Sequence, residues 1–308
     1  MGVASTGPDN SYLKFCKYDM AFTNRFDANS PSRHYAWVTS TTQTPGIRDV
    51  EFARHLIDPD AFQIVRILQN RGFTTYLVGG CVRDIILGKH PKDFDIATNA
   101  RPQEVKRAVS NAFIIGRRFR LVLVKRGDMQ YEVSTFRRDP RPDENLEELP
   151  GGDNLFGSPE EDARRRDFTI NCLFYDPIAC RLIDYAEGLP DLEAGVVRMI
   201  GDPNVRLNED PIRILRGIRL AHMIRFSLDS DLRLAMQKHS ENLLNTALPR
   251  RREEILKFLR LDNPALPFLT SMDLGVLDLS FQRLTRPFER LGSSSVAIDR
   301  VRGLVVRG

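Results

Sequence analysis

The spacing of apolar residues changes near residue 201 and divides the sequence into two parts. Before this point, apolar residues at helical spacing alternate with short apolar runs that are typical of strands. After it, Pro203, Pro211 and Leu248-Pro249 each begin a helical pattern, because proline is favoured in the first turn of a helix. The pattern predicts an α+β fold, with a mixed sheet and its helices followed by an all-helical part.

A predicted turn from a strand to a helix lies at Gly79-Gly80. Residues 76–78 form an apolar, β-rich run before the two glycines, and a short helical run after them ends at Gly88. Two glycines at such a turn let backbone N–H groups and a helix N-terminus approach an anion closely. The sequence therefore predicts a phosphate-binding turn at this position.

Asp93 and Asp95 follow this turn within a few residues. If residues 93–97 are extended, the side chains of residues i and i+2 point to the same face. Two neighbouring carboxylates repel each other unless a cation lies between them, and Mg²⁺ binds oxygen ligands. A phosphate-binding turn beside a metal site held by Asp93 and Asp95 is the equipment of phosphoryl or nucleotidyl transfer.

A hairpin is predicted over residues 119–124 and 129–136, with Arg126-Gly127-Asp128 supplying the turn. Glu132 lies on the more polar face of the second strand, because neighbouring residues of a strand alternate between the two faces. If the hairpin packs beside the strand of the two aspartates, Glu132 becomes a third carboxylate of the site. The alternative is an ordinary exposed glutamate.

Polar side chains also cluster on two predicted helices. Ser158-Pro159-Glu160-Glu161 is a capping box that opens the first of them. Asp210 and Arg213 lie three residues apart on a helix that begins at Pro211 or just before it, so the two side chains can pair. The alternative readings are a solvated basic face and a plain surface salt bridge. The first helix is predicted to carry Arg164, Arg165, Arg166, Asp167 and Asn171.

Composition narrows the class of protein. The 308 residues are 42% apolar and 28% charged, which fits a soluble globular protein of one or two domains. No apolar run approaches the roughly 18–20 residues that cross a bilayer, so no membrane partner is expected. The net charge of +4 is modest. Residues 101–138 are richer in Lys and Arg than in Asp and Glu, which suits a surface that meets phosphates, although a solvated face would look the same.

Cysteine usage and the N-terminal sequence add two further expectations. Cys16, Cys81, Cys172 and Cys180 form no C-x-x-C pair, which favours free thiols in a reducing compartment, the cytoplasm, and no zinc site. Residues 1–50 are rich in Ser, Thr, Asn and Pro without a sustained period, so we expect a disordered arm there.

Four motifs in order carry a resemblance to a known family. They are YLVGGCVRDIILGKHPKDFD at residues 76–95, GRRF at 116–119, RRDF at 165–168 and EDPIR at 209–213. In this order, they resemble the class II nucleotidyltransferases that add nucleotides to RNA 3′ ends, a family of bacterial poly(A) polymerases and CCA-adding enzymes. The resemblance implies a polymerase-β-like nucleotidyltransferase head over residues 51–200. It also implies a helical neck and RNA-binding part over residues 201–308, shortened at the C-terminus.

The resemblance also implies a role for each motif. Two Mg²⁺ ions would be held by Asp93 and Asp95, with Glu132 as a further carboxylate. Asp167 is matched to an aspartate that relatives require for activity. The incoming nucleoside triphosphate would meet Gly79, Gly80, Arg83, Arg165, Arg166 and Asn171, with Asp210 and Arg213 selecting its base. RNA phosphates would pass Arg117, Arg118 and Arg120.

Within the family, the sequence of residues 114–121 resembles the signature of poly(A) polymerases. The usual continuation has histidine where this chain has Leu123, so the match is incomplete. The favoured function is transfer of AMP from ATP to RNA 3′ ends in mRNA processing. CCA addition in tRNA processing is the second hypothesis. A catalytically silent RNA-binding relative is a third, which the intact Asp pair argues against. A D-x-D glycosyltransferase would not need the Arg-rich motifs.

Overall fold

The computed structural model describes residues 46–116, 121–141, 144 and 155–277. All of them lie within one structural unit of the chain. The predicted arm falls mostly outside the described residues, since its first 45 residues are not among them. Its predicted end at residue 50 is wrong. Ile47–Asp49 form strand β1, which pairs with another strand, and Val50 is buried, so the folded part begins before residue 50.

The centre of the fold is an eight-stranded mixed sheet with the strand order β1-β8-β7-β2-β3-β6-β5-β4. Among these strands, β3 and β6 pair in parallel, and every other neighbouring pair is antiparallel. After β1, the strands are β2 (Thr75–Val78), β3 (Asp95–Thr98), β4 (Ala112–Ile115), β5 (Leu121–Arg126), β6 (Met129–Thr135), β7 (Leu173–Asp176) and β8 (Arg181–Asp184). The predicted hairpin is confirmed as β5 and β6, with Gly127 at a positive φ of 52° in the turn.

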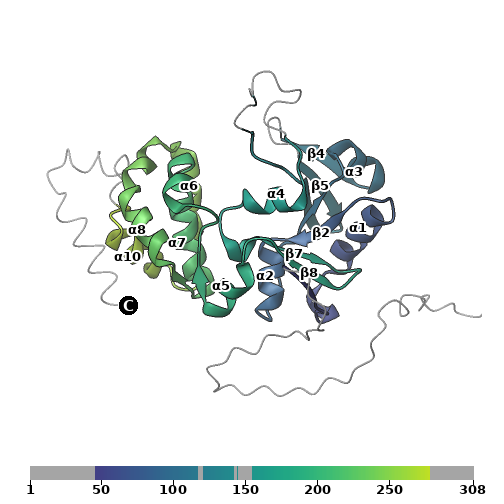
Figure 1. Ribbon diagram of the computed structural model, residues 1–308, viewed down its shortest axis with the longest axis horizontal. Coiled ribbons are helices and arrows are strands. Elements are labelled where there is room, and N and C mark those ends of the chain that lie inside the picture. Colours follow the sequence, from purple (N-terminus) through teal and green to yellow (C-terminus); the bar gives the residue numbers. More distant parts are fainter. Residues whose placement is uncertain (1–45, 117–120, 142–143, 145–154, 278–308) are drawn as a thin grey trace, which may run out of the picture. The chain divides into compact units, whose positions relative to one another are not determined.

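Helices cover one face of the sheet. Helix α1 (Pro59–Gln69) buries Ile64, Val65 and Leu68 on one side, and α3 (Pro102–Ala108) buries Val105. These residues share one apolar core with alternate residues of the central strands. Figure 1 shows α1 and α3 beside each other at the sheet. Apolar burial at this spacing is what holds short helices on a sheet.

The opposite face of the sheet has a smaller apolar cluster. Val78, Ala97 and Phe174 pack there with Ala163 of helix α4 (Pro159–Arg164). The predicted capping box is confirmed. The Ser158 hydroxyl accepts from the Glu161 backbone N–H at 3.2 Å, and the Glu161 carboxylate accepts from the Ser158 backbone N–H at 2.7 Å. Toward β6, β5 and β4 this face becomes exposed.

The helix predicted to continue through Asn171 is shorter than expected. Helix α4 ends at Arg164, residues 165–168 leave the helix, and Thr169–Asn171 form the 3-10 turn η3. The reason is a set of backbone hydrogen bonds to a later segment. The Thr169 N–H donates to Arg198 and the Ile200 N–H donates to Asp167. Phe168 is thereby drawn into the core, where 1% of its surface is exposed.

Helices dominate the rest of the chain. They are α5 (Gly188–Ala194), α6 (Pro203–Glu209), α7 (Arg213–Ile224), α8 (Ser230–Lys238), α9 (Leu248–Phe258) and α10 (Ala265–Asp273). The all-helical prediction after residue 201 is nearly right. The difference is β10 (Ser227–Leu228), which pairs with β9 (Val196–Val197). The remaining described elements are α2 (Gly80–Ile86) and the 3-10 turns η2 (Arg54–Leu56) and η4 (Ser240–Asn245).

Helices α7 and α8 meet the sheet part at Phe168. Gly217 of α7 lies against its ring, and a Cβ at position 217 would come within 3.1 Å of Phe168 and 2.5 Å of Met236 in α8. Glycine is therefore required by close packing at this contact. The Arg219 guanidinium and the buried Glu254 carboxylate join α7 to α9 at 2.9 Å. Among the described residues, no helix combines the length and apolarity needed to cross a membrane.

A partly buried hydrogen bond joins the N-cap of α1 to the strand that carries Glu132. The Tyr131 hydroxyl donates to Asp58 at 2.7 Å, and the same carboxylate oxygen caps α1 by accepting from the N–H groups of Asp60 and Ala61. Burial of the ring and this hydrogen bond to Asp58 both raise the pKa of Tyr131. The neutral phenol is therefore the form that belongs to the fold.

Replacing Tyr131 with Phe should lower the free energy of unfolding by about 1.5–3 kcal/mol, the usual contribution of a hydrogen bond to a charged group. The ring stays in place, so the slope of a urea unfolding curve should not change while its midpoint falls. Asp58→Ala, which also removes the helix cap, should cost more. An unchanged midpoint for Tyr131→Phe would show that this contact adds nothing to stability.

Candidate active site

Two carboxylates face each other across the parallel strand pair. In the register of β3 and β6, Asp95 is directly opposite Glu132, and both side chains are exposed. The hairpin thus lies beside the strand of the aspartates, as the sequence predicted. Directly opposed residues of neighbouring strands have side chains on the same face, with Cβ atoms about 5 Å apart. Strand pairing alone therefore gathers these two charges.

Asp93 joins them from outside the strand. Strand β3 begins at Asp95, and Asp93 lies in a bend before it, so the prediction of one extended segment over residues 93–97 is wrong for its first two residues. Asp93 is nevertheless close enough to raise the pKa of Asp95. Three carboxylates therefore interact at the start of β3.

Crowding changes the chemistry of Asp95. Surrounding protein atoms displace part of its hydration although the side chain remains exposed, and this is the largest cause that raises its pKa, to about 6. The Glu132 and Asp93 charges raise it further, while the Arg166 guanidinium opposes them. Among the described residues, the site thus carries an excess of negative charge that the Arg166 guanidinium offsets only in part.

The carboxylates suit a hard cation. No three His, Cys, Asp or Glu side chains are gathered into a metal-binding group in the part of the chain that the structure describes. Mg²⁺ does not need such a group, since it commonly uses one or two carboxylates and completes its shell with water and substrate phosphates. The mutual repulsion at Asp95 is the condition that a bound cation would relieve. The donor set therefore fits Mg²⁺.

The predicted phosphate-binding turn lies beside Asp95. Gly79 caps α2 with a φ of 77°, a conformation that favours glycine. A Cβ on Gly79 would come within 3.4 Å of Arg166 Nη1 and 3.7 Å of Asp95 Oδ2. The missing side chain therefore leaves room between a guanidinium and a carboxylate of the candidate site.

Arg83 and Asn171, both predicted to meet the nucleotide, contact each other. Arg83 is buried, and its Nη1 donates to Asn171 Oδ1 at 2.5 Å while its Nη2 pairs with Asp84 at 2.7 Å. These bonds join α2 to the segment of η3. The guanidinium is thereby held beside the glycine turn, 3.6 Å from where a Cβ of Gly80 would lie, and its contact with the nucleotide stays a prediction.

Arg166 is held toward Asp95 by two contacts. Its guanidinium pairs with Asp162 of α4 at 2.9 Å and lies over the ring of Phe174, 5.3 Å from the centroid. Arg165, the preceding residue, points elsewhere and pairs with Asp139 at 3.5 Å. Arg165 and Arg166, both predicted to meet the nucleotide, therefore occupy different surroundings.

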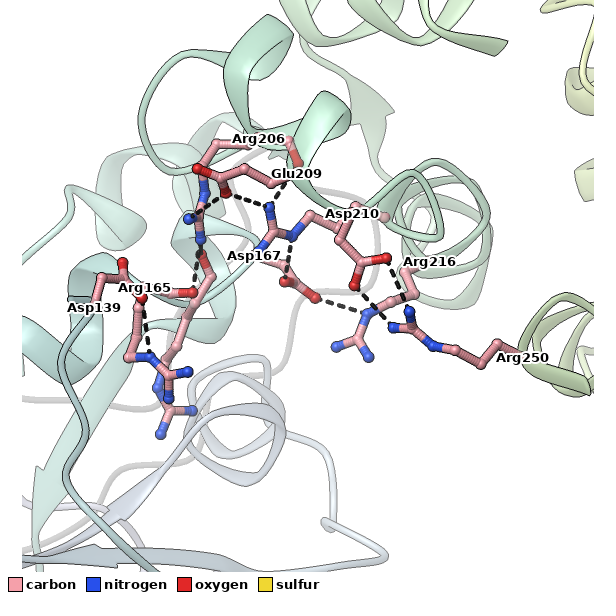
Figure 2. Close-up of polar contacts among 10 residues, drawn as sticks. Asp139, Arg165, Asp167, Arg206, Glu209, Asp210, Arg216 and Arg250 are labelled. Carbon is pink, nitrogen blue, oxygen red and sulfur yellow. Dashed lines mark hydrogen bonds and ion pairs between the residues drawn. The ribbon is translucent and has the colours of Figure 1, made fainter. Parts of the chain in front are cut away.

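Asp167 connects this segment to the helices that follow. Its carboxylate accepts a hydrogen bond from Nε of Arg213 at 3.2 Å and forms an ion pair with Nε of Arg216 at 2.7 Å (Figure 2). Arg213 and Arg216 lie one turn apart on the same face of α7, which explains why one carboxylate receives both. Arg206 of α6 adds hydrogen bonds to the backbone carbonyls of Arg165 and Arg166.

The predicted pairing of Asp210 with Arg213 is wrong. Asp210 lies between α6 and α7, and its carboxylate pairs with Arg250 of α9 at 2.8 and 3.2 Å (Figure 2). Arg213 instead pairs with the carboxylate of Glu209 at 3.0 Å, in addition to that of Asp167. Spacing of three residues implies contact only within one helix, and a helix junction separates these two residues.

Sequence reasoning missed three residues of this network, Arg206, Arg216 and Arg250, and named Glu209 only as part of the EDPIR motif. The spacing of Arg213 and Arg216 was a usable signal, but nothing local singles out Arg250 from its two arginine neighbours. Arg250 and Asp210 also line a polar cavity of about 310 Å³. Its other lining residues are Asn208, Glu209, Pro211, Asn242, Asn245, Thr246 and Ala247. The predicted RNA contacts Arg117, Arg118 and Arg120 lie outside the described residues.

The mixed sheet with its opposed carboxylates, followed by the helices, defines a nucleotidyltransferase head and neck. Residues 75–198 match the model of the poly(A) polymerase head domain, and residues 225–285 match one described as a probable RNA and SrmB binding site of polymerase A. The chain belongs to the class II RNA 3′-terminal nucleotidyltransferase family, which contains bacterial poly(A) polymerases and CCA-adding enzymes.

Individual relatives come from both branches of the family. Poly(A) polymerase I of Haemophilus influenzae is 39% identical over 237 residues, or 74% of this chain and 52% of the relative. A CCA-adding enzyme of Lactobacillus helveticus is 35% identical over 209 residues, or 65% and 50%. The crystal structure of the Bacillus stearothermophilus CCA-adding enzyme with CTP superposes with a TM-score of 0.64 at 29% identity, covering 71% and 53%. The chain spans about half the length of the curated relatives it matches.

The raised pKa of Asp95 predicts a pH-dependent stability. An unfolded aspartate titrates near pH 4, so between about pH 4 and 6 the folded protein binds more protons than the unfolded chain. The free energy of unfolding therefore falls as the pH rises through this window. Asp95→Asn should stabilise the protein at pH 7.5 by about 1 kcal/mol, a value reduced from the full shift because solvent screens an exposed side chain.

Urea unfolding at pH 3.5 and pH 7.5 measures this effect, with Asp128→Asn, an exposed aspartate in the β5–β6 turn, as the matched control. The stabilisation should be present at pH 7.5, shrink at pH 3.5 and be absent in the control. Equal stability of wild type and Asp95→Asn at pH 7.5 would mean that the pKa of Asp95 is not raised in solution.

Proposed function

We propose that the protein transfers AMP from ATP to RNA 3′ ends without a template, as a poly(A) polymerase does. The observation that carries the proposal is the register of Asp95 opposite Glu132, next to Gly79 and Arg166. The higher identity and longer coverage of the relative named Poly(A) polymerase I favour ATP over CTP as substrate. In this proposal the partners are RNA and a nucleoside triphosphate.

The proposed catalytic head covers residues 51–200, extended by β1, and the proposed RNA-binding part covers residues 201–308. The match of residues 225–285 to an RNA-binding model supports the second assignment. Asp167 lies at the contact between the two parts, which supports a role in aligning them.

Asp93, Asp95 and Glu132 are the residues that would hold Mg²⁺. When bound, the metal ions lower the pKa of the RNA 3′-hydroxyl and neutralise charge on the pyrophosphate. The protein's own residues position the nucleoside triphosphate. Gly79 leaves space for the triphosphate, and Arg166 places positive charge next to it, held in place by Asp162 and Phe174. Catalysis then consists of positioning and charge neutralisation, with no covalent protein intermediate.

In this proposal, Asp210 and Arg213 select the base from the junction of α6 and α7. Both carry charged partners, so a base edge must share or displace part of these ion pairs. A base that returns fewer hydrogen bonds than it displaces is disfavoured, because an unpaired buried polar group costs about 1–3 kcal/mol. This cost would provide the discrimination between adenine and cytosine.

CCA addition to tRNA is the second candidate function. It is favoured by the resemblance to a solved CCA-adding enzyme with CTP, which covers 71% of this chain. The two candidates use the same carboxylates and differ in nucleotide choice and in when the reaction stops. Products formed on a defined RNA therefore distinguish them.

The first functional prediction concerns the carboxylates. Asp93→Ala and Asp95→Ala should each reduce nucleotide incorporation on the order of 100-fold or more, a typical loss when one electrostatic group of a transition state is removed. Asp128→Ala, on the β5–β6 turn, is the matched control and should retain activity. Incorporation of labelled ATP into an oligoadenylate in saturating Mg²⁺ is the measurement. Wild-type rates for both variants would exclude the proposed metal site.

The second functional prediction concerns nucleotide choice. Arg213→Ala should lower the preference for ATP over CTP roughly tenfold, within the 1–3 kcal/mol cost of an unpaired buried group. Total turnover with a mixed pool should fall less. The measurement is incorporation of ATP and of CTP, each offered alone, on a generic RNA and on a tRNA lacking its terminal residues. If the wild type adds two cytidines and one adenosine to the trimmed tRNA and stops, CCA addition replaces poly(A) synthesis.

A further inference from the structure

A row of directly paired residues crosses the sheet from the carboxylates to its edge. Glu132 of β6 has Asp95 on one side and Leu123 of β5 on the other. Leu123 in turn pairs with Phe113 of β4, the last strand of the sheet. Because paired residues share a face, Phe113 lies on the face of the carboxylates. Three strand spacings of about 4.8 Å place it about 14 Å from Asp95.

Phe113 is unusually exposed for a large aromatic residue. About half of its surface, 52%, is open to solvent, and Ile115 on the same face of β4 is 41% exposed. An exposed apolar edge strand invites aggregation unless the surface has a use. Two exposed apolar residues beside a polar site therefore indicate a contact surface.

A cation lies over the Phe113 ring. Lys125 of β5 is two residues after Leu123, so it shares the same face, and its Nζ is 6.0 Å from the centroid of the ring. Toward the middle of the face come the polar side chains of Gln130 and Glu132. An aromatic ring with an ammonium group beside it matches one nucleotide of a single strand, because the base stacks on the ring while the cation meets the phosphate.

Continuity with the carboxylates favours RNA over a protein partner. The surface along the row from Asp95 to Phe113 is accessible to solvent throughout, since Glu132 is exposed and Leu123 is half-buried. A strand whose 3′ end lies at Asp95 can therefore run along the row. At about 3.4 Å per stacked nucleotide, 14 Å corresponds to about four nucleotides.

We propose that Phe113 and Lys125 form a stacking site for a base of single-stranded RNA, within about four nucleotides of the reacting 3′ end. The proposal rests on the proposed function for the position of the 3′ end. It assigns β4 and β5 a role in holding the RNA upstream of the chemistry. The site is tolerant of sequence, because every base has a π face.

The experiment compares binding of oligoadenylates of two and six nucleotides to the full chain, with 2-aminopurine at each position of the hexamer in turn. Phe113→Leu should weaken hexamer binding roughly tenfold, within the range of one lost stacking contact, and leave dinucleotide binding unchanged. Phe113→Trp keeps a π face and should retain hexamer binding. Stacking should quench 2-aminopurine at one position between the second and the fifth nucleotide, and Phe113→Leu should remove this quenching.

Met129→Ala is the matched control, because Met129 is 42% exposed on β6 but points to the opposite face from Glu132. It should bind both oligomers as the wild type does. Lys125→Gln should flatten the salt dependence of hexamer binding by about one phosphate contact, a log–log slope change of about 0.7. Thermal unfolding of each variant, within a few degrees of the wild type, shows that the fold is kept.

Three results would overturn the inference. The first is equal hexamer binding by wild type and Phe113→Leu. The second is an equal loss of binding for both oligomers. The third is a loss of self-association, measured by sedimentation, in place of a loss of RNA binding, which would assign the surface to a protein contact. A failure of the proposed function gives a different result from a failure of this inference. In that case the protein adds no nucleotide to any RNA, while hexamer binding still depends on Phe113.

Discussion

The parallel pairing of β3 with β6 is the constraint on which the rest of the structure depends. It sets Asp95 opposite Glu132 and so concentrates negative charge at one point of the sheet. Parallel neighbours cannot be joined by a tight turn, so the chain must leave the sheet and return. Here α3, β4 and β5 make that return, and the hairpin of β5 and β6 brings the strand back in register. The topology of the sheet is therefore what brings the two carboxylates together.

Such a concentration of charge has to be tolerated by the fold without a metal ion. The structure places one guanidinium, that of Arg166, where it lowers the pKa that burial and the neighbouring acids raise. Arg166 is itself held by Asp162 and by the Phe174 ring, so it does not collapse fully onto Asp95. The compensation is therefore partial. A site left short of positive charge binds cations and is mildly destabilising when empty of them, and these two properties have the same electrostatic cause.

The sequence predicted what depends on neighbouring residues and failed where distant residues decide. The capping box at Ser158, the β5–β6 hairpin and the glycine turn are local features, and the structure has all three. The helix after Ser158 was predicted too long, because the backbone bonds that draw out Phe168 come from residues about 30 positions later. Asp210 was paired with Arg213 by spacing. Its actual partner, Arg250, lies 40 positions away and cannot be identified from spacing.

The segment Arg165–Asp167 joins the two halves of the candidate site mechanically. Arg206 holds its backbone carbonyls, and Arg213 and Arg216 hold the Asp167 carboxylate, so three arginines of the helical part grip three consecutive residues (Figure 2). Arg166, in the middle of this segment, is the cation beside Asp95. A shift of α6 or α7 on contact with a base would therefore move Arg166 as well. If Asp210 and Arg213 select the base, as proposed, one short backbone segment connects base selection to the charge at the carboxylates, and no longer-range pathway is needed.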